Sequence, residues 1–161
     1  MGSGKSGLYS GTRGSIAHPG SVDYMSPKDP FSINIKNRPD VDANGFYDVI
    51  AHGTSHSIQI HVNSKPVEID HRTASNLFKR NPEFKGKSIR LLSCDTGADS
   101  RGFAQNLANK LNVVVEAPTK MVWAYPNGKY FVAAMKKDGS RQPDMSNRGK
   151  FIKFYPGGKK K

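Results

Sequence analysis

The sequence predicts one α/β domain built on a mainly parallel β-sheet, and three observations predict it. Two apolar runs rich in strand-forming residues, 46–51 and 88–93, end at His52 and Cys94 respectively. The stretch 88–116 has the pattern strand, helix, strand, which is that of a parallel crossover. A chain of 161 residues suits a single core, in which helices cover a sheet.

The beginning of the chain predicts no regular structure, because it is rich in Gly, Ser and Pro and has little periodicity. We therefore expect a flexible arm or linker over residues 1–30, a folded domain over 31–156 and a basic tail over 157–161. The first six residues also lack the apolar stretch of a secretory signal. Any delivery signal is expected elsewhere.

The elements of the first half follow from alternation and turn residues. Residues 31–35 alternate apolar and polar side chains, which predicts a strand. The Asn44-Gly45 turn leads into the first apolar run. A second alternating run at 57–62 and the short run 67–69 predict a hairpin. Asp70 can cap a helix that continues to about residue 80.

The second half begins with the apolar run that leads to Cys94. A helix from about Ser100 to Leu111 should follow, because its apolar residues recur at helical spacing. The remaining expected elements are a strand at 113–115, a hairpin of 121–125 and 130–134, a polar loop over 136–150 and a strand at 151–155.

Composition limits the partners and the compartment. The chain has 25 basic and 13 acidic residues, a net charge of +12, which favours a polyanion partner or a solvated basic surface. Its mean hydropathy is −0.63, and no apolar run reaches membrane-spanning length. The single cysteine rules out an internal disulfide and, as a working thiol, favours a reducing compartment.

His52 and Cys94 are the residues most suited to chemistry. The carboxyl ends of parallel strands gather at one edge of a sheet, so the two side chains should meet there. An imidazole beside a thiol can generate the nucleophilic thiolate and later protonate a leaving amine. The alternative for each is plain: a strand-end cysteine can be a small apolar core residue, and a histidine before glycine can mark a turn.

The two blocks Val49-Ile50-Ala51-His52-Gly53 and Ile89-Arg90-Leu91-Leu92-Ser93-Cys94 resemble those of caspase-like cysteine peptidases, in which the histidine also precedes the cysteine. Within that group, residues 102–107 and 149–156 are similar to the autoprocessing domains of large bacterial toxins. The stretch 91–98 also resembles carboxy-terminal modules of polymorphic bacterial toxins. The likeness covers about residues 46 to 156.

The resemblance implies a caspase-like, mainly parallel sheet flanked by helices, with a β-rich C-terminal flap. It implies that Cys94 attacks a peptide carbonyl, that His52 transfers protons, and that the backbone N–H groups of Gly53 and Cys94 bind the oxyanion. An aspartate before the histidine strand, Asp40 or Asp42, could orient His52, although each also fits a turn. The domain would be secreted or delivered within a larger bacterial protein and cleave itself or a target in the cytosol of another cell.

The same resemblance suggests inositol hexakisphosphate as an activator, because toxin autoprocessing domains bind it with lysines and arginines. No other cofactor and no metal is expected. The candidate ligands are basic residues in and near the expected flap: Lys129, Lys136, Lys137, Arg141, Lys150 and Lys153.

Three other interpretations stay open. The block His52-Gly53-Thr54 is similar to one in ADP-ribosyltransferase toxins, which would need a catalytic glutamate, and Glu116 is the last in the chain. A metal site from His52, His56, His61 and Cys94 has poor spacing. A non-enzymatic module that binds nucleic acid would use the charge and the aromatic residues Tyr125, Tyr130, Phe131 and Tyr155, and we consider nucleic acid the weaker partner.

Overall fold

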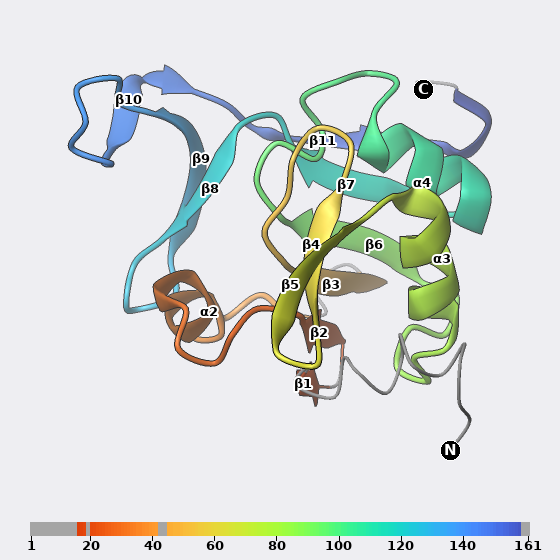
Figure 1. Cartoon of the computed structure of the whole chain (residues 1–161). Coiled ribbons are helices and arrows are strands. Elements are labelled where there is room, and N and C mark those ends of the chain that lie inside the picture. The colour runs from red at the N-terminus through yellow and green to blue at the C-terminus, as the bar shows by residue number, and fades with distance from the viewer. Residues whose placement is uncertain (1–15, 19, 42–44, 159–161) are drawn as a thin grey trace.

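The computed structural model describes residues 16–18, 20–41 and 45–158, and its centre is a six-stranded sheet (Figure 1). The strand order is β1-β2-β3-β6-β7-β11. The four middle strands are parallel, while β1 and β11 run antiparallel to their neighbours. The prediction of a mainly parallel sheet is confirmed. The strands are β1 (Ile16–His18), β2 (Ser21–Asp23), β3 (Phe46–Ile50), β6 (Ser88–Leu92), β7 (Val115–Pro118) and β11 (Phe151–Phe154).

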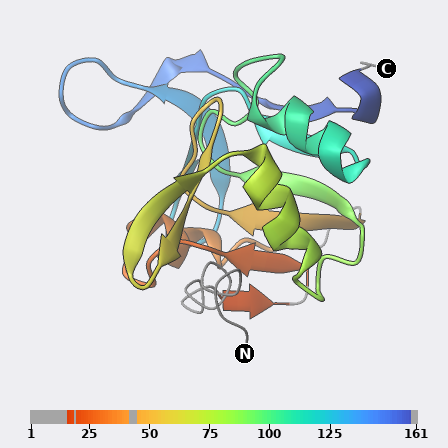
Figure 2. The same cartoon turned by 45° about the vertical axis from the view of Figure 1, so that its right-hand side comes forward.

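One face of the sheet packs on two helices, α3 (His71–Lys79) and α4 (Phe103–Leu111), as Figure 2 shows. The predicted cap of α3 is confirmed, since the Asp70 side chain accepts a hydrogen bond from the Thr73 N–H. The hairpin of β4 (Ile58–Val62) and β5 (Lys65–Ile69) lies on the same side and is also confirmed. These elements bury the larger of two apolar clusters.

The opposite face is covered by α2 (Pro30–Ile35) and by a second sheet of β8 (Met121–Ala124), β9 (Tyr130–Met135) and β10 (Pro143–Arg148). Here Ile35, Ile50 and Leu92 are buried together. The hairpin expected at 121–134 is confirmed as β8–β9. In Figure 1, α2 and this second sheet lie to one side of the central sheet, beyond the carboxyl ends of β3 and β6.

A buried charge network lies under the second sheet. Asp48 of β3 is fully buried and is bound by two guanidinium groups, those of Arg38 at 2.8 Å and Arg90 at 2.7 Å. Arg90 also binds Asp40 at 2.9 Å, and the Tyr130 hydroxyl of β9 donates to the same carboxylate at 2.5 Å. Because each buried charge has a partner, the network is tolerated and ties the second sheet to β3 and β6.

The strand predicted at 31–35 is wrong, because these residues form α2. Asp29 accepts a hydrogen bond from the Phe31 N–H, and Pro30 occupies the first helical position, where its missing N–H costs nothing. These capping residues favour a helix more strongly than the alternation of apolar and polar residues, which spans only five positions, favours a strand. The short run therefore misled a prediction from periodicity.

The predicted boundary at residue 31 is also wrong. Residues 1–15 lie outside the described part, but β1 and β2 are strands of the central sheet, and Ser21–Asp23 is buried throughout. The domain therefore begins inside the expected arm. Tail residues 159–161 lie outside the described part as well.

Two expectations for the C-terminal region need correction. The loop predicted over 136–150 contains β10, which pairs antiparallel with β9. The last strand, β11, joins the central sheet beside β7 and does not belong to the second sheet. Within the described ranges, no helix has both the length and the apolar character needed to cross a bilayer.

Candidate active site

His52 and Cys94 emerge side by side from neighbouring parallel strands. Ile50 and Leu92 are register partners at the ends of β3 and β6, and each reactive residue follows its strand end by two positions. Both side chains line one pocket of about 280 Å³ at this edge of the sheet. The juxtaposition predicted from the two apolar runs is therefore present in the structure.

The rest of the pocket is almost entirely apolar. Its walls come from α2 and β8, and its floor from the ends of β3 and β6 and the segment after β2. The lining side chains besides His52 and Cys94 are Met25, Pro30, Phe31, Asn34, Ala51, Leu92, Val122, Trp123 and Ala124. Asn34 spans the gap between the walls, since its side-chain N–H donates to the Ala124 carbonyl at 3.0 Å.

His52 is held by a carboxylate that the sequence interpretation did not select. Its Nε2 lies 2.6 Å from Oδ2 of Asp29, and the imidazole side chain is 47% exposed. The other oxygen of Asp29 accepts from the Phe31 N–H at 2.9 Å. When Nε2 carries the imidazole proton and donates it to Asp29, Nδ1 is left as the proton acceptor.

Cys94 is half-buried and carries a neutral thiol at neutral pH. Burial, with smaller contributions from the negative charges of Asp95 and Asp29, raises its pKa to about 11, although a hydrogen bond from the Val122 N–H acts to lower it. That N–H lies 3.4 Å from Sγ. A proton acceptor such as His52 is therefore needed to form the thiolate at neutral pH.

The loops that carry His52 and Cys94 pack directly against each other. A Cβ atom added to Gly53 would lie 2.9 Å from the Cys94 carbonyl oxygen and 2.8 Å from the Thr96 methyl group. Glycine is therefore the residue that permits this approach. Beyond it, the Phe103 N–H donates to the Ser55 carbonyl at 2.8 Å, which joins the same loop to the start of α4.

The backbone N–H of Gly53, a predicted oxyanion donor, is not used by the bridge that follows His52. Gly53 forms an isolated antiparallel bridge with Ile58. That bridge is closed by hydrogen bonds from Thr54 to Ser57 and from Gln59 to His52, and neither uses the Gly53 N–H. The Cys94 N–H, the second predicted donor, lies against its own thiol, whose pKa it lowers.

Asp40, one of the two aspartates considered from sequence, does not orient His52. Asp40 binds Arg90 and Tyr130, whose hydrogen bonds overcome the effect of burial and lower its pKa. Asp42 lies outside the described residues. The signal that could have found Asp29 is the pair Asp29-Pro30, since an aspartate before a proline is typical of a helix start.

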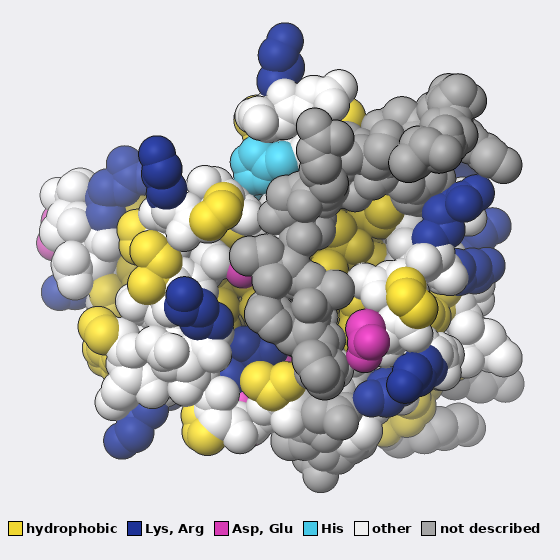
Figure 3. Space-filling view, turned by 90° about the horizontal axis from the view of Figure 1, so that it is seen from below, with side chains coloured by type: hydrophobic (Ala, Val, Ile, Leu, Met, Phe, Trp, Pro, Cys, Tyr) yellow, Lys and Arg dark blue, Asp and Glu magenta, His cyan; other side chains and the backbone are white. Residues whose placement is uncertain are grey.

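The candidate polyphosphate ligands are not brought together as one set. Lys129 precedes β9, and Lys136, Lys137 and Arg141 lie in the turn that follows it. A six-residue strand separates the two groups by roughly 20 Å. Lys150 lies in the short link from β10 to β11, and Lys153 is on β11 with its amine over the Phe46 ring. On the face seen in Figure 3, Lys and Arg side chains in general are scattered in several separate places.

The two other histidines of the alternative metal site, His56 and His61, lie in separate surroundings. His56 pairs with Asp99 at 3.1 Å, and His61 hydrogen-bonds the Tyr24 carbonyl at 2.9 Å. In the part of the chain that the structure describes, no three His, Cys, Asp or Glu side chains gather as a metal site requires. Glu116 is a register partner of Arg90 in the middle of the sheet, and it is not among the residues that line the pocket.

Comparison with known proteins gives a family match. The family model described as "Domain of unknown function (DUF8616)" matches residues 20–132, a stretch that contains Asp29, His52, Cys94 and the whole lining of the pocket. No curated protein and no solved structure matches the chain.

Proposed function

The chain belongs to the DUF8616 family, and from the site it carries we propose that it is a cysteine peptidase with Cys94 as nucleophile and His52 as general acid and base. The observation that carries the proposal is the shared pocket: a thiol and an imidazole from neighbouring parallel strands, with a carboxylate bound to Nε2 of the imidazole. Nucleophile, base and orienting group are the parts that acyl transfer needs.

The proposed reaction uses these groups in turn. His52 takes the thiol proton as Sγ of Cys94 attacks the peptide carbonyl carbon, and the N–H groups of Gly53 and Cys94 stabilise the oxyanion. Such a donor is worth about 3 kcal/mol of the barrier. Protonated His52 then gives its proton to the leaving amine, which leaves a thioester on Cys94. His52 next activates a water molecule, which releases the acid product and restores the thiol.

The edge of β8 supports an extended peptide as the substrate. Val122 and Ala124 direct their main-chain groups away from β9, because the Val122 N–H reaches Cys94 and the Ala124 carbonyl receives Asn34. In an antiparallel pair, the N–H and the carbonyl of one residue point to the same side of the strand. The Val122 carbonyl and the Ala124 N–H therefore also point away from β9, and they lie between the contact with Cys94 and the contact with Asn34. A peptide strand that pairs with these two groups lies along the pocket, beside the Cys94 thiol.

The pocket itself supports an apolar side chain next to the scissile bond. Phe31, Leu92 and Trp123 contribute to its surface, and no lysine, arginine or glutamate does. Burial of a leucine-sized side chain is worth about 2 kcal/mol, whereas burial of an unpaired charge is unfavourable. We therefore propose cleavage beside leucine or a residue of similar size.

The caspase-like architecture and the toxin setting belong to the same proposal. The parallel order β2-β3-β6-β7, with the histidine strand before the cysteine strand, supports the former. For the latter, a single cysteine suits action in a reducing cytosol.

The test is to incubate the protein with cell lysate, with and without inositol hexakisphosphate, and to map new protein termini by mass spectrometry. Wild type and His56→Ala, a matched histidine control, should produce the same new termini, with leucine-like residues before the cut. Cys94→Ala and His52→Ala should produce none. Equal cleavage by wild type and Cys94→Ala, or no cleavage by wild type under either condition, would overturn the proposal.

A further inference from the structure

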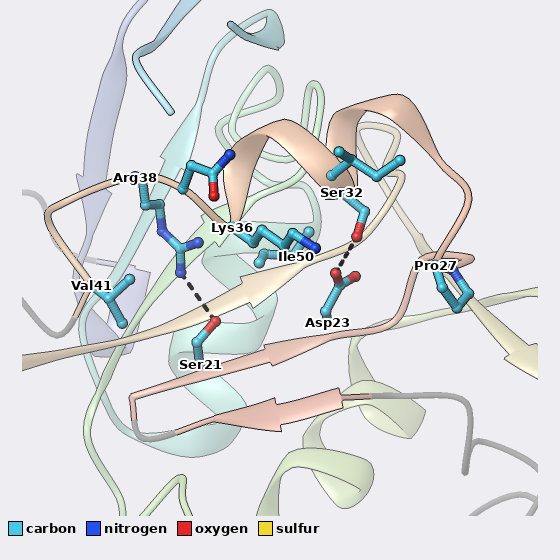
Figure 4. Close-up of a pocket in the computed structure, with 10 residues that line it drawn as sticks. Ser21, Asp23, Pro27, Ser32, Lys36, Arg38, Val41 and Ile50 are labelled. Atoms are coloured by element: carbon cyan, nitrogen blue, oxygen red, sulfur yellow. Dashed lines mark hydrogen bonds between the residues drawn. The ribbon is translucent and has the colours of Figure 1, made fainter. Parts of the chain in front are cut away.

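Helix α2 separates the active-site pocket from a second and larger cavity. This cavity has a volume of about 410 Å³ and lies between α2 and the strands β2 and β3 (Figure 4). We call it the α2 cavity. Its lining includes the apolar side chains of Pro27, Ile33, Val41 and Ile50 and the cationic side chains of Lys36 and Arg38. The one carboxylate among the lining residues, that of Asp23, accepts hydrogen bonds from the Ser32 hydroxyl and the Met25 N–H.

The lining of the α2 cavity favours an anion with an apolar body. Arg38 is fixed in place, because its guanidinium binds Asp48 and the Ser21 hydroxyl. Lys36, in contrast, is exposed, and Figure 4 shows its amine extending into the cavity. Ile33 is one of the few large apolar side chains left exposed, at 43%. An apolar surface beside an exposed amine can bind a hydrophobic carboxylate or sulfonate, whose apolar body and anionic group contact these two features.

The position of α2 couples the two cavities. Successive faces of this six-residue helix line them: Phe31 and Asn34 face the active-site pocket, whereas Ile33 and Lys36 face the α2 cavity. The residue that caps the helix is Asp29, which holds His52. A ligand in the α2 cavity therefore touches the helix whose first turn positions the imidazole.

The strand that leads to His52 forms a second connection. Ile50, the last residue of β3, lines the α2 cavity, and the chain reaches the active-site pocket at Ala51. On the floor of the α2 cavity, the Ser32 hydroxyl donates to Asp23 and fixes α2 to β2. An occupant that shifts α2 relative to β2 and β3 would change the position of the Asp29 carboxylate relative to the His52 imidazole.

We propose that the α2 cavity is an effector site for a small organic anion with an apolar body, and that its occupancy alters the active-site pocket through α2. Binding to the cavity does not depend on the proposed peptidase function. Only the biological consequence rests on that function.

Binding can be tested with 8-anilinonaphthalene-1-sulfonate, an aromatic anion whose fluorescence rises when it leaves water. Wild type should bind it saturably. Lys36→Glu and Ile33→Asp should each weaken binding at least tenfold, by reversing the charge and by removing the apolar surface. The matched controls are Lys79→Glu on α3 and Val67→Asp on β5, because Lys79 and Val67 are also exposed but lie away from the cavity. Both controls should bind the probe as wild type does. Equal binding by Lys36→Glu and wild type would overturn the site.

Coupling can be tested through the rate at which iodoacetamide alkylates Cys94, a readout that needs no peptidase activity. Saturating anilinonaphthalene sulfonate should change this rate at least twofold in wild type and Lys79→Glu. At the same probe concentration it should have a smaller effect in Lys36→Glu, because that variant binds the probe more weakly. A rate that the bound probe leaves unchanged in wild type would overturn the coupling.

Discussion

Asp29 and His52, 23 positions apart in the sequence, are joined by a 2.6 Å hydrogen bond between Oδ2 and Nε2. The same carboxylate caps α2 through its other oxygen. One side chain therefore starts the helix that forms a wall of the pocket and fixes the imidazole within it. The direction of the His52 ring is set by where α2 begins.

Replacement of Asp29 by asparagine should separate its two roles. Asparagine still caps a helix, so α2 should form, but the negative charge that stabilises protonated His52 is lost. We expect the rate of peptide cleavage to fall about 10²-fold, as for a misplaced catalytic group. The control is Asp99→Asn, which removes the partner of His56 and should leave the rate unchanged. Equal rates for both variants would show that Asp29 only caps the helix.

Gly53→Ala should disturb the contact between the two reactive loops. The new methyl group would meet the Cys94 carbonyl oxygen at 2.9 Å and must push the loops apart. A displacement of about 1 Å is expected to lower the cleavage rate on the order of 10²-fold. Gly157→Ala is the contrast, because open space surrounds that position although its φ is +84°. It should cost about 1 kcal/mol of stability without loss of activity, and an equal loss of activity in both variants would contradict the contact argument.

The reactivity of the free thiol should report its raised pKa. With a pKa of about 11, against an ordinary value of 9.0, Cys94 gains thiolate as the pH rises toward 11 and loses it below. The rate of iodoacetamide alkylation should therefore rise about tenfold per pH unit from 7 to 10 in the folded protein. In urea the rate should level off near pH 9. A plateau below pH 8 in the folded protein would mean that the thiolate is already formed without substrate.

Tyr130→Phe should weaken the buried charge network. The phenol donates to Asp40 and accepts from Arg90, so its removal should cost about 1 kcal/mol in the free energy of unfolding at pH 7. Burial alone would raise the pKa of Asp40, but the hydrogen bonds from Arg90 and Tyr130 lower it below 3.8. Their stabilisation is present above pH 3.8 and is lost as the pH falls through the lower folded value.

Urea unfolding of wild type and Tyr130→Phe at pH 7 and pH 3 checks this prediction. The difference between the two proteins should be smaller at pH 3 than at pH 7, because pH 3 lies below the ordinary aspartate value of 3.8, where this stabilisation has begun to fall. A difference that grows on acidification would contradict the assignment of the lowered pKa to these hydrogen bonds.

The strand ends could be predicted because their signal is long and local. Residues 46–51 and 88–93 are mostly apolar runs, interrupted only by Asp48 and Arg90 in their middles, and the crossover rule then places the ends of two parallel strands together. Short elements could not be predicted in the same way. Alternation over the five residues 31–35 is a weaker signal for a strand than the helix cap at Asp29 is for a helix. The polar β10 is a strand only because β9 offers it hydrogen bonds.

Asp29 shows a second limit of the sequence. Its closeness to His52 depends on the direction in which α2 leaves β2, which is set by packing of Ile35 against Ile50 and by the bond from Ser32 to Asp23. No periodicity or spacing encodes that direction. Aspartates nearer to the histidine strand were therefore the natural candidates, although Asp40 serves the charge network.

The most direct measurement is covalent labelling with a peptidyl acyloxymethyl ketone that carries leucine next to the ketone, because this reagent forms a thioether only with a correctly aligned thiol. We predict one adduct, mapped by mass spectrometry to Cys94, in wild type and in His56→Ala. His52→Ala should react about 10²-fold more slowly, since it lacks the base. Equal labelling of His52→Ala and wild type, or no adduct on Cys94 in wild type, would contradict a working pair of His52 and Cys94.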